Sequence, residues 1–180
     1  MAHYCVIDEL RAMEFHDSIL NAVSINGGEV RMVFSDAIII GQSFPEKKDR
    51  LRCSVNDGED RYACPHLTVT FHGFEVQSII KLGFISQDAQ GNIIAQCPTV
   101  TLAADEHDAF WKYICSVEVI QVDGLSYDEE NGTWTLCILP DYGIDCYEVT
   151  FHSNNSIAEF DEFGKEAWYL DSKWRNQIQK

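Results

Sequence analysis

The chain has 180 residues, of which 46% are hydrophobic and 12% aromatic, a composition that supports a folded core and argues against a disordered chain. Its 29 acidic and 13 basic side chains give a formal net charge of −16, and the second half is the more acidic. A field of this sign repels nucleic acid and anionic membranes, attracts basic partners and speeds their encounter. A simpler interpretation is that the charge only keeps the protein soluble.

Cysteine usage indicates a reducing compartment. The seven cysteines form no Cys-x-x-Cys pair, and several lie in apolar runs, where a free thiol behaves as a small hydrophobe. No secretion signal follows Met1, and no apolar run approaches the roughly 20 residues that a transmembrane helix needs. We therefore expect a cytoplasmic protein.

The N-terminal region predicts one short helix and a hairpin. Residues 4–15 contain good helix formers with acids near the start, which favours a helix. Residues 19–25 and 29–35 alternate between apolar and polar side chains, as half-buried strands do. Between them, Asn26-Gly27-Gly28 predicts a tight turn, because these residues tolerate a positive φ.

The middle of the chain predicts further strands. We expect an apolar strand over 36–40, a polar loop over 42–60 with a short strand at 51–55, and strands over 67–71 and 74–84. A turn over 87–92 precedes a weaker strand over 93–102, which Pro98 would restrict to a sheet edge.

The second half predicts three strands between two helical segments. Residues 105–108 begin a helical turn that leads into Phe110 and Trp111. Strands are expected over 114–122, 134–138 and 147–151, the last with Tyr147, Val149 and Phe151 inward, and turns at 123–124, 129–132 and 140–143. Apolar residues at helical spacing over 162–180 predict a C-terminal helix. The predicted fold class is therefore α+β, mostly β, with antiparallel sheets of hairpins or meanders and a C-terminal helix.

An internal echo suggests a duplicated unit. The sequence Val-Thr-Phe-His ends at His72 and again at His152, and each copy follows a strand, a glycine turn and an apolar strand. We expect one domain over residues 1–180, within which residues 15–85 and 110–163 form a degenerate repeat of a β-meander. The alternative is two unrelated strands that share an alternation common to half-buried sheets.

The segment 113–164 concentrates negative charge. It holds eleven Asp or Glu and no Lys or Arg, and its acids are interleaved with strand-like runs, so they should lie on a folded β-sheet. The candidates for partner contact are acids at predicted turns and strand ends, with two tyrosines as aromatic anchors: Asp123, Tyr127, Asp128, Glu129, Glu130, Asp141, Tyr142 and Asp145. The alternative interpretation is a solvated acidic face.

Possible metal ligands do not have the spacing of a metal site. Cys64 lies near His66 and His72, and Cys146 lies near His152, but the close ligand pairs of a structural zinc site are missing. The core-facing alternation of residues 67–71 should also turn both nearby histidines toward solvent. We predict no metal.

No catalytic motif is present either. The chain lacks a Gly-x-Ser-x-Gly elbow, a Walker loop and a dinucleotide-binding fingerprint. With this many Cys, His and acidic residues, some triad can always be named, so a triad is uninformative. His16 and Asp17 could form a polar pair at a strand entrance, but we favour a structural role in which Asp17 or Ser18 satisfies backbone donors where helix gives way to strand. We predict neither enzymatic activity nor a cofactor.

The run from Glu14 to Ile25, which contains Phe-His-Asp, and the apolar strand that follows it resemble the start of immunity proteins of bacterial polymorphic toxin systems. In that family a Trp or Phe followed by His-Asp begins a β-rich domain. The run that ends in Phe71-His72-Gly73 and the strand at Trp134 are similar in character. The resemblance implies a cytoplasmic protein that neutralises a toxin by direct binding, and it assigns no catalytic residue.

Charge and resemblance together predict an acidic binding protein, an immunity protein or inhibitor that blocks a basic toxin domain, a nuclease or another nucleic-acid enzyme. Such a protein would bind neither nucleic acid nor a membrane. Two alternatives stay open. A small cytoplasmic hydrolase would bring His16, His66 or a cysteine together in a cleft. A self-associating structural or phage-type protein would show a large exposed apolar patch or a symmetric interface.

Overall fold

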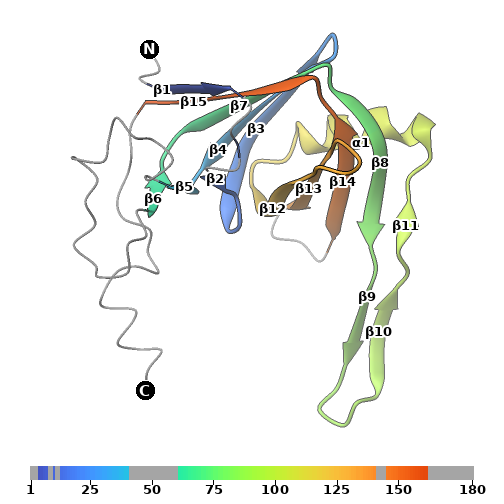
Figure 1. Cartoon of the computed structure of the whole chain (residues 1–180). Coiled ribbons are helices and arrows are strands. Elements are labelled where there is room, and N and C mark those ends of the chain that lie inside the picture. The colour runs from blue at the N-terminus through green and yellow to red at the C-terminus, as the bar shows by residue number, and fades with distance from the viewer. Residues whose placement is uncertain (1–3, 8–9, 11–12, 41–60, 141–144, 162–180) are drawn as a thin grey trace, which may run out of the picture.

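The computed structural model describes residues 4–7, 10, 13–40, 61–140 and 145–161, which form mostly antiparallel β-strands (Figure 1). The strands are β1 (Tyr4–Ile7), β2 (Met13–Glu14), β3 (Ser18–Asn26), β4 (Glu29–Ser35), β5 (Ala37–Ile40), β6 (Arg61–Cys64), β7 (Leu67–His72), β8 (Glu75–Leu82), β9 (Phe84–Gln87), β10 (Ile93–Cys97), β11 (Val100–Thr101), β12 (Ile120–Asp128), β13 (Thr133–Pro140), β14 (Cys146–His152) and β15 (Asn155–Phe160). A 3-10 turn (Ala104–Glu106) leads into the helix α1 (His107–Ile114). The predicted α+β, mostly β class is confirmed.

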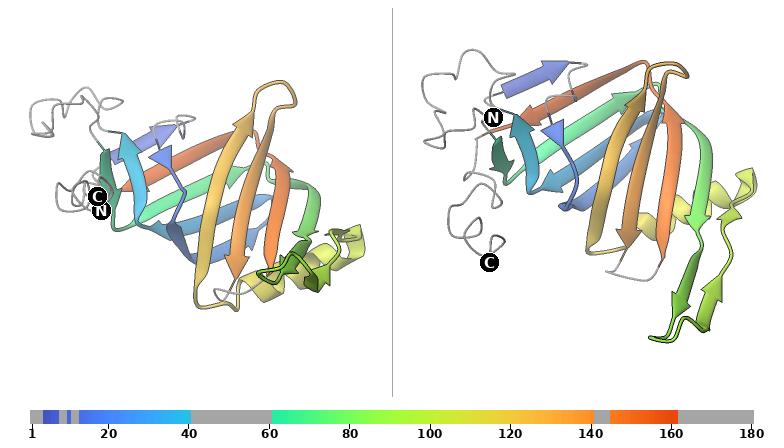
Figure 2. Two further views of the ribbon diagram at one scale, coloured as in Figure 1. Left: turned by 90° about the horizontal axis from the view of Figure 1, so that it is seen from below. Right: turned by 60° about the horizontal axis from the view of Figure 1, so that its bottom comes forward.

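Ten strands form one antiparallel sheet in the order β1-β15-β7-β4-β3-β12-β13-β14-β8-β11. A three-stranded sheet, β2-β5-β6, and a two-stranded ribbon, β10-β9, complete the β structure of the described residues. The large sheet bends so strongly that β7 and β14 face each other, although four strands lie between them in the sheet (Figure 2). The rings of Phe71 and Phe151 are 5.0 Å apart across this bend.

The bend divides the large sheet into two leaves, which consist of β15-β7-β4-β3 and β12-β13-β14-β8. An approximate twofold axis between β3 and β12 relates the strand pairing of one leaf to that of the other. Leu20 lies opposite Ile120 and Ser18 opposite Val122, so exchanging the two strands reproduces the register. The hairpins β3–β4 and β12–β13 carry a register shift at the equivalent position, after Leu20 and after Val122.

In each half of the chain, the last strand crosses to the leaf that the other half forms. β8 follows β7 in the chain but pairs with β14, and β15 follows β14 but pairs with β7. The order β3, β4, β7, β8 therefore corresponds to the order β12, β13, β14, β15. A duplicated unit would produce this arrangement, and the common origin of the two halves stays a prediction.

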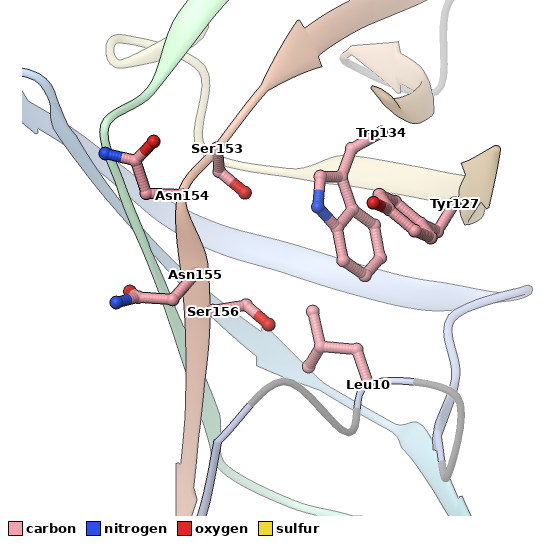
Figure 3. A pocket seen from close by; sticks show the side chains of 7 residues that line it. All are labelled: Leu10, Tyr127, Trp134, Ser153, Asn154, Asn155 and Ser156. Atoms are coloured by element: carbon pink, nitrogen blue, oxygen red, sulfur yellow. The ribbon is translucent and has the colours of Figure 1, made fainter. Parts of the chain in front are cut away.

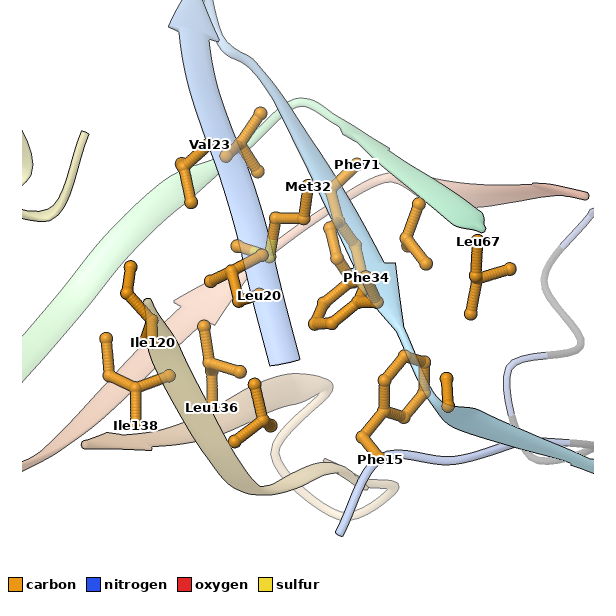
Figure 4. Packing of buried hydrophobic residues seen from close by; sticks show 14 of the residues in the cluster. Phe15, Leu20, Val23, Met32, Phe34, Leu67, Phe71, Ile120, Leu136 and Ile138 are labelled. Carbon is orange, nitrogen blue, oxygen red and sulfur yellow. The ribbon is translucent and has the colours of Figure 1, made fainter. Parts of the chain in front are cut away.

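One hydrophobic cluster fills the space between the leaves (Figure 4). Leu67, Val69 and Phe71 alternate inward from β7 with no exposed surface, and Val149 and Phe151 do the same from β14. This alternation is the reason that both segments form strands, because a period of two places every second side chain on the buried face.

The best local predictions are confirmed. β3 and β4 form the expected hairpin, and Gly27 and Gly28 occupy its turn with φ of 57° and 82°. The predicted strands over 67–71, 134–138 and 147–151 are present, and the helical turn over 105–108 leads into α1. The expected strand over 74–84 is present as β8 with the start of β9.

Three local predictions are wrong. The single helix predicted over residues 4–15 is wrong, because residues 4–7 form β1, which pairs with β15, and residues 13–14 form β2, which pairs with β5; this pairing outweighs the marginal propensity of a short helix. The segment from Ile114 is not yet a strand, since Ile114 ends α1, which buries three apolar side chains at helical spacing. Asp123-Gly124 is a bulge within β12 rather than a turn.

Several predicted features lie outside the described residues. These are the loop over 42–60 with its strand at 51–55, most of the turn at 140–143, and the C-terminal helix over 162–180. Among the described helices, none is long and apolar enough to cross a membrane.

Candidate binding surface at the tip of the β12–β13 hairpin

The β12–β13 hairpin closes with a four-residue turn over 129–132. The carboxylate of Asp128 accepts hydrogen bonds from the backbone N–H of Glu130 at 2.9 Å and from the side-chain amide of Asn131 at 2.6 Å. The side-chain and backbone hydrogen bonds from Asn131, followed by the one from Glu130, hold the pKa of Asp128 below its ordinary value. The sequence-predicted Asp128 thus organises the turn that presents its neighbours.

Tyr127 stands beside this turn as a braced aromatic side chain. It lies opposite Trp134 in the register of the hairpin, and the two rings are 4.9 Å apart. Trp134 in turn contacts Phe71 in the core at 5.3 Å, whereas Tyr127 remains 41% exposed. One side of the predicted aromatic anchor therefore packs on Trp134, and the other side is open to solvent.

Two adjoining hollows lie beside this aromatic pair, and we call them together the tip groove; Figure 3 shows the smaller of the two. Leu10, Tyr127 and Trp134 line both of them. The smaller hollow, of about 170 Å³, is completed by residues 153–156. The larger, of about 320 Å³, is completed by Met13, Leu125, Ser126 and Glu129.

Polar atoms from the β14–β15 connection face the groove. In Figure 3 the hydroxyls of Ser153 and Ser156 point toward its interior, whereas the amides of Asn154 and Asn155 point away. The Ser153 hydroxyl is shielded from solvent and has no hydrogen-bond partner among the described residues. The groove thus combines an aromatic wall and apolar side chains with a shielded hydroxyl directed toward its interior.

The predicted acids do not all gather at this tip. Glu129 and Glu130 are exposed in the turn, and the hairpin extends beyond its neighbours in the left view of Figure 2. Asp145 lies at the other end of β13 and β14, where its carboxylate is 2.7 Å from Lys81 Nζ. This hydrogen bond raises the pKa of Lys81 and offsets the charge of Asp145. Asp141 and Tyr142 lie outside the described residues.

Asp123 lies in the bulge of β12 and belongs to a different cluster. His16 Nε2 is 3.5 Å from Asp123 Oδ1, and His16 Nδ1 is 3.0 Å from Asp17 Oδ2. All three side chains are more than half exposed, so these contacts contribute little to stability. The predicted polar pair of His16 and Asp17 is therefore present, joined by a third residue from the other leaf.

Asp17 and Ser18 stabilise the turn before β3 in a different way from the one expected. Ser18 donates its hydroxyl to the carbonyl of Phe15 at 2.6 Å, and its N–H bonds to the same oxygen at 3.0 Å. Ser18 therefore satisfies a backbone acceptor rather than a donor. Asp17 occupies the left-handed region with φ of 64°, and the turn connects two extended segments rather than a helix and a strand.

The possible metal ligands are dispersed. His66 is exposed and His72 half-buried, as the alternation of β7 predicts, and His72 Nδ1 lies 3.1 Å from Glu29 Oε2. His152 Nδ1 lies 2.9 Å from the carbonyl of Gly132. In the part of the chain that the structure describes, no three His, Cys, Asp or Glu side chains are grouped to hold a metal ion.

The cysteines on β13 and β14 are poor nucleophiles. Burial and then the neighbouring Glu148 raise the pKa of the Cys137 thiol to about 11, and burial also raises the pKa of Cys146. A protonated thiol does not attack a substrate. No observation at these positions therefore favours a cysteine-dependent hydrolase.

Sequence reasoning missed the partners of Tyr127. Trp134 had a partial signal, because Asn131-Gly132 predicts a hairpin turn shortly before it, but only the four-residue turn over 129–132 places it opposite Tyr127. Ser153 and Leu10 had none, since β15 was not predicted and Leu10 was assigned to a helix. Only the long-range pairing of β1, β15 and β7 brings these residues to the groove.

Comparison with known proteins gives no family assignment. A scan against protein-family models, a search of curated proteins and a search of solved structures each found no match.

Proposed function

We propose that the protein is an acidic binding module that captures a basic protein partner through the tip of the β12–β13 hairpin and the tip groove. The observation that supports this most directly is Tyr127, which is braced on Trp134 and lies beside Glu129 and Glu130. Tyrosine is one of the residue types enriched at interface hot spots, and polar, solvent-accessible side chains such as these glutamates are typical of the rim of an interface.

The charge and the groove have separate roles in capture. The net charge of −16 accelerates encounter with a basic surface, and salt weakens this effect. The groove then holds the complex, because an Arg or Lys side chain can lay its aliphatic stem against Leu10 and its cation over the ring of Tyr127. Such a cation–π contact is worth about 0.5–2 kcal/mol, depending on how far it is desolvated.

The sequence resemblance suggests the biological setting of this capture. In that setting the protein is a cytoplasmic immunity protein, and the partner is a basic toxin domain, a nuclease or another nucleic-acid enzyme. The cysteines support a reducing compartment, since five of those that the structure describes are free thiols: Cys5, Cys97, Cys115, Cys137 and Cys146.

The test begins with capture of a partner from the source organism by the full chain, followed by binding kinetics at low and high salt. Reversing charge at the tip, with Glu129→Lys and Glu130→Lys together, should slow association about tenfold at low salt. The matched control is Asp105→Lys with Asp108→Lys, which makes the same charge change at exposed positions beside and within α1. Unchanged capture by the tip variant, or an equal loss in the control, would contradict the proposal.

A further inference from the structure

The β9–β10 ribbon projects from the ten-stranded sheet as an arm formed by residues 83–99 (Figures 1 and 2). Its root is fixed on both sides. The N–H of Gly83 donates to Thr99 Oγ1 at 3.0 Å, and a Cβ on Gly83 would lie 2.5 Å from the carbonyl oxygen of Cys97. The arm is therefore a fixed continuation of β8 and β11 rather than an open loop.

The arm exposes large aliphatic side chains. Ile85, Ile93 and Ile94 are 60%, 57% and 66% exposed, and Val100 on the adjoining β11 is 46% exposed. These four are half of the large hydrophobic residues that are exposed in the described chain. Single exposed aliphatics are ordinary, but such a concentration on one projecting element marks a surface that is covered in the working state.

The arm is almost without charge on a strongly acidic protein. Its single charged residue is Asp88, whose carboxylate accepts hydrogen bonds from the N–H of Gln90 at 2.9 Å and from the N–H and amide of Asn92 at 2.8 Å each. Asp88 thus closes the turn between β9 and β10. Nearly the whole net charge of −16 lies elsewhere on the chain.

The arm also has backbone groups available for pairing. β9 pairs with β10 only, and no third strand joins them among the residues that the structure describes. A two-stranded ribbon alone is marginally stable in water, and its outer edges present unpaired N–H and C=O groups. Addition of further strands would satisfy these groups and bury the isoleucines.

We propose that the arm is a self-association surface, which packs against the arm of a second copy of this chain across a twofold axis. Two copies repel each other wherever their acidic surfaces meet, so the uncharged arm is the place where they can approach. A twofold axis pairs each patch with itself, and an aliphatic patch is complementary to itself. A basic partner, by contrast, finds no opposite charge on the arm.

The test is the oligomeric state of the full chain, measured by sedimentation equilibrium over a wide concentration range. We expect a dimer whose dissociation constant falls as salt screens the repulsion between the two acidic bodies. Ile85→Glu and Ile93→Glu should each raise that constant about tenfold or more, because each removes apolar burial from both copies and adds charge. Both positions are exposed, so circular dichroism should show an unchanged fold.

The matched control is Ile7→Glu, which alters an isoleucine of the same 60% exposure on β1, at the opposite edge of the large sheet. It should leave the dimer intact. A chain that is monomeric at every concentration, a dimer that survives both arm substitutions, or a dimer that Ile7→Glu dissociates would each overturn the inference.

A second measurement does not depend on any variant. Isotope-filtered nuclear Overhauser spectra of a mixed labelled and unlabelled sample should show contacts between the isoleucine methyls of the two arms, and contacts only elsewhere would overturn the inference. Because the arm shares no residue with the tip groove, these results leave the proposed partner binding to its own test.

Discussion

The two halves of the large sheet have the same pairing but end in different hairpins. In the first half, β3 and β4 are joined by Gly27 and Gly28 alone, and Ile25 lies opposite Val30 in the second residue pair from the turn. In the second half the turn has four residues, and the equivalent register position holds Tyr127 opposite Trp134. A shared backbone thus presents an aliphatic pair on one side and an aromatic pair beside two carboxylates on the other.

The segment that precedes each hairpin also differs. α1 precedes β12 and packs at the end of the first hairpin, where Cys115 Sγ donates to the carbonyl of Val23 at 3.3 Å. Leu10 and Met13 precede β3 and lie at the end of the second hairpin, where they line the tip groove. The hollow beside α1, of about 500 Å³, is lined by charges of both signs, Asp108 and Lys112. The two hairpin ends are equivalent in backbone pairing but differ in their side chains. The proposed binding surface therefore depends on the side chains at the end of the β12–β13 hairpin and not on the shared backbone.

The largest effect should come from the element that the halves share. Phe71→Ala and Phe151→Ala remove equivalent, fully buried rings that contact each other, and each should cost about 3–5 kcal/mol of unfolding free energy. The double variant should cost less than the sum, because the first truncation already removes the ring contact. Urea unfolding measures the free energy of unfolding of all three variants. A much smaller loss for one single change than for the other would show that the two rings are not equivalent in the core.

Partner affinity should distinguish the two hairpins, although the stability of the fold depends on both halves. Tyr127→Ala should lower affinity for the captured partner by about 2 kcal/mol, or roughly thirtyfold, as expected for a hot-spot aromatic. Ile25→Ala, at the equivalent position of the first hairpin, should leave affinity unchanged. Titration calorimetry checks both, and equal losses would mean that the two hairpins are not functionally different.

The turns give the smallest effect. Asp128→Asn places in the second turn the residue type that the first has at the equivalent Asn26, and it should lower the melting temperature slightly at neutral pH. Since hydrogen bonds lower the pKa of Asp128 in the fold, its stabilisation is complete above the unfolded pKa of about 3.9 and disappears as pH falls through the folded value. The two melting temperatures should therefore converge in acid, and a gap that persists would exclude a carboxylate effect.

Local patterns in the sequence were sufficient for much of this fold. The alternation over 67–71 and 147–151 and the Gly27-Gly28 turn act within one strand or one hairpin, so they are visible in the chain itself. Several failures concern long-range pairing, whereas the strand expected from Ile114 failed because that residue ends the helix α1. The crossing of β8 and β15 to opposite leaves and the pairing of β1 with β15 depend on residues far apart in the sequence.

The candidate site divides in the same way. The exposure of Tyr127, Glu129 and Glu130 at a turn followed from local pattern and charge. The neutralisation of Asp145 by Lys81 did not, because these residues meet only through the pairing of β14 with β8. Trp134 on β13, Ser153 after β14 and Leu10 near the N-terminus all line the groove. Leu10 is more than 100 residues from the other two, so no local sequence pattern could place it beside them.

The most direct test of the central claim is an exchange of hairpin tips. Replacing residues 127–134 by the sequence of residues 25–30 keeps the register of the flanking strands, removes the aromatic pair and lowers the number of acids at the tip from three to one. We expect this chimera to fold and to lose capture of the basic partner. A folded chimera that captures the partner as tightly as the natural chain would contradict the account.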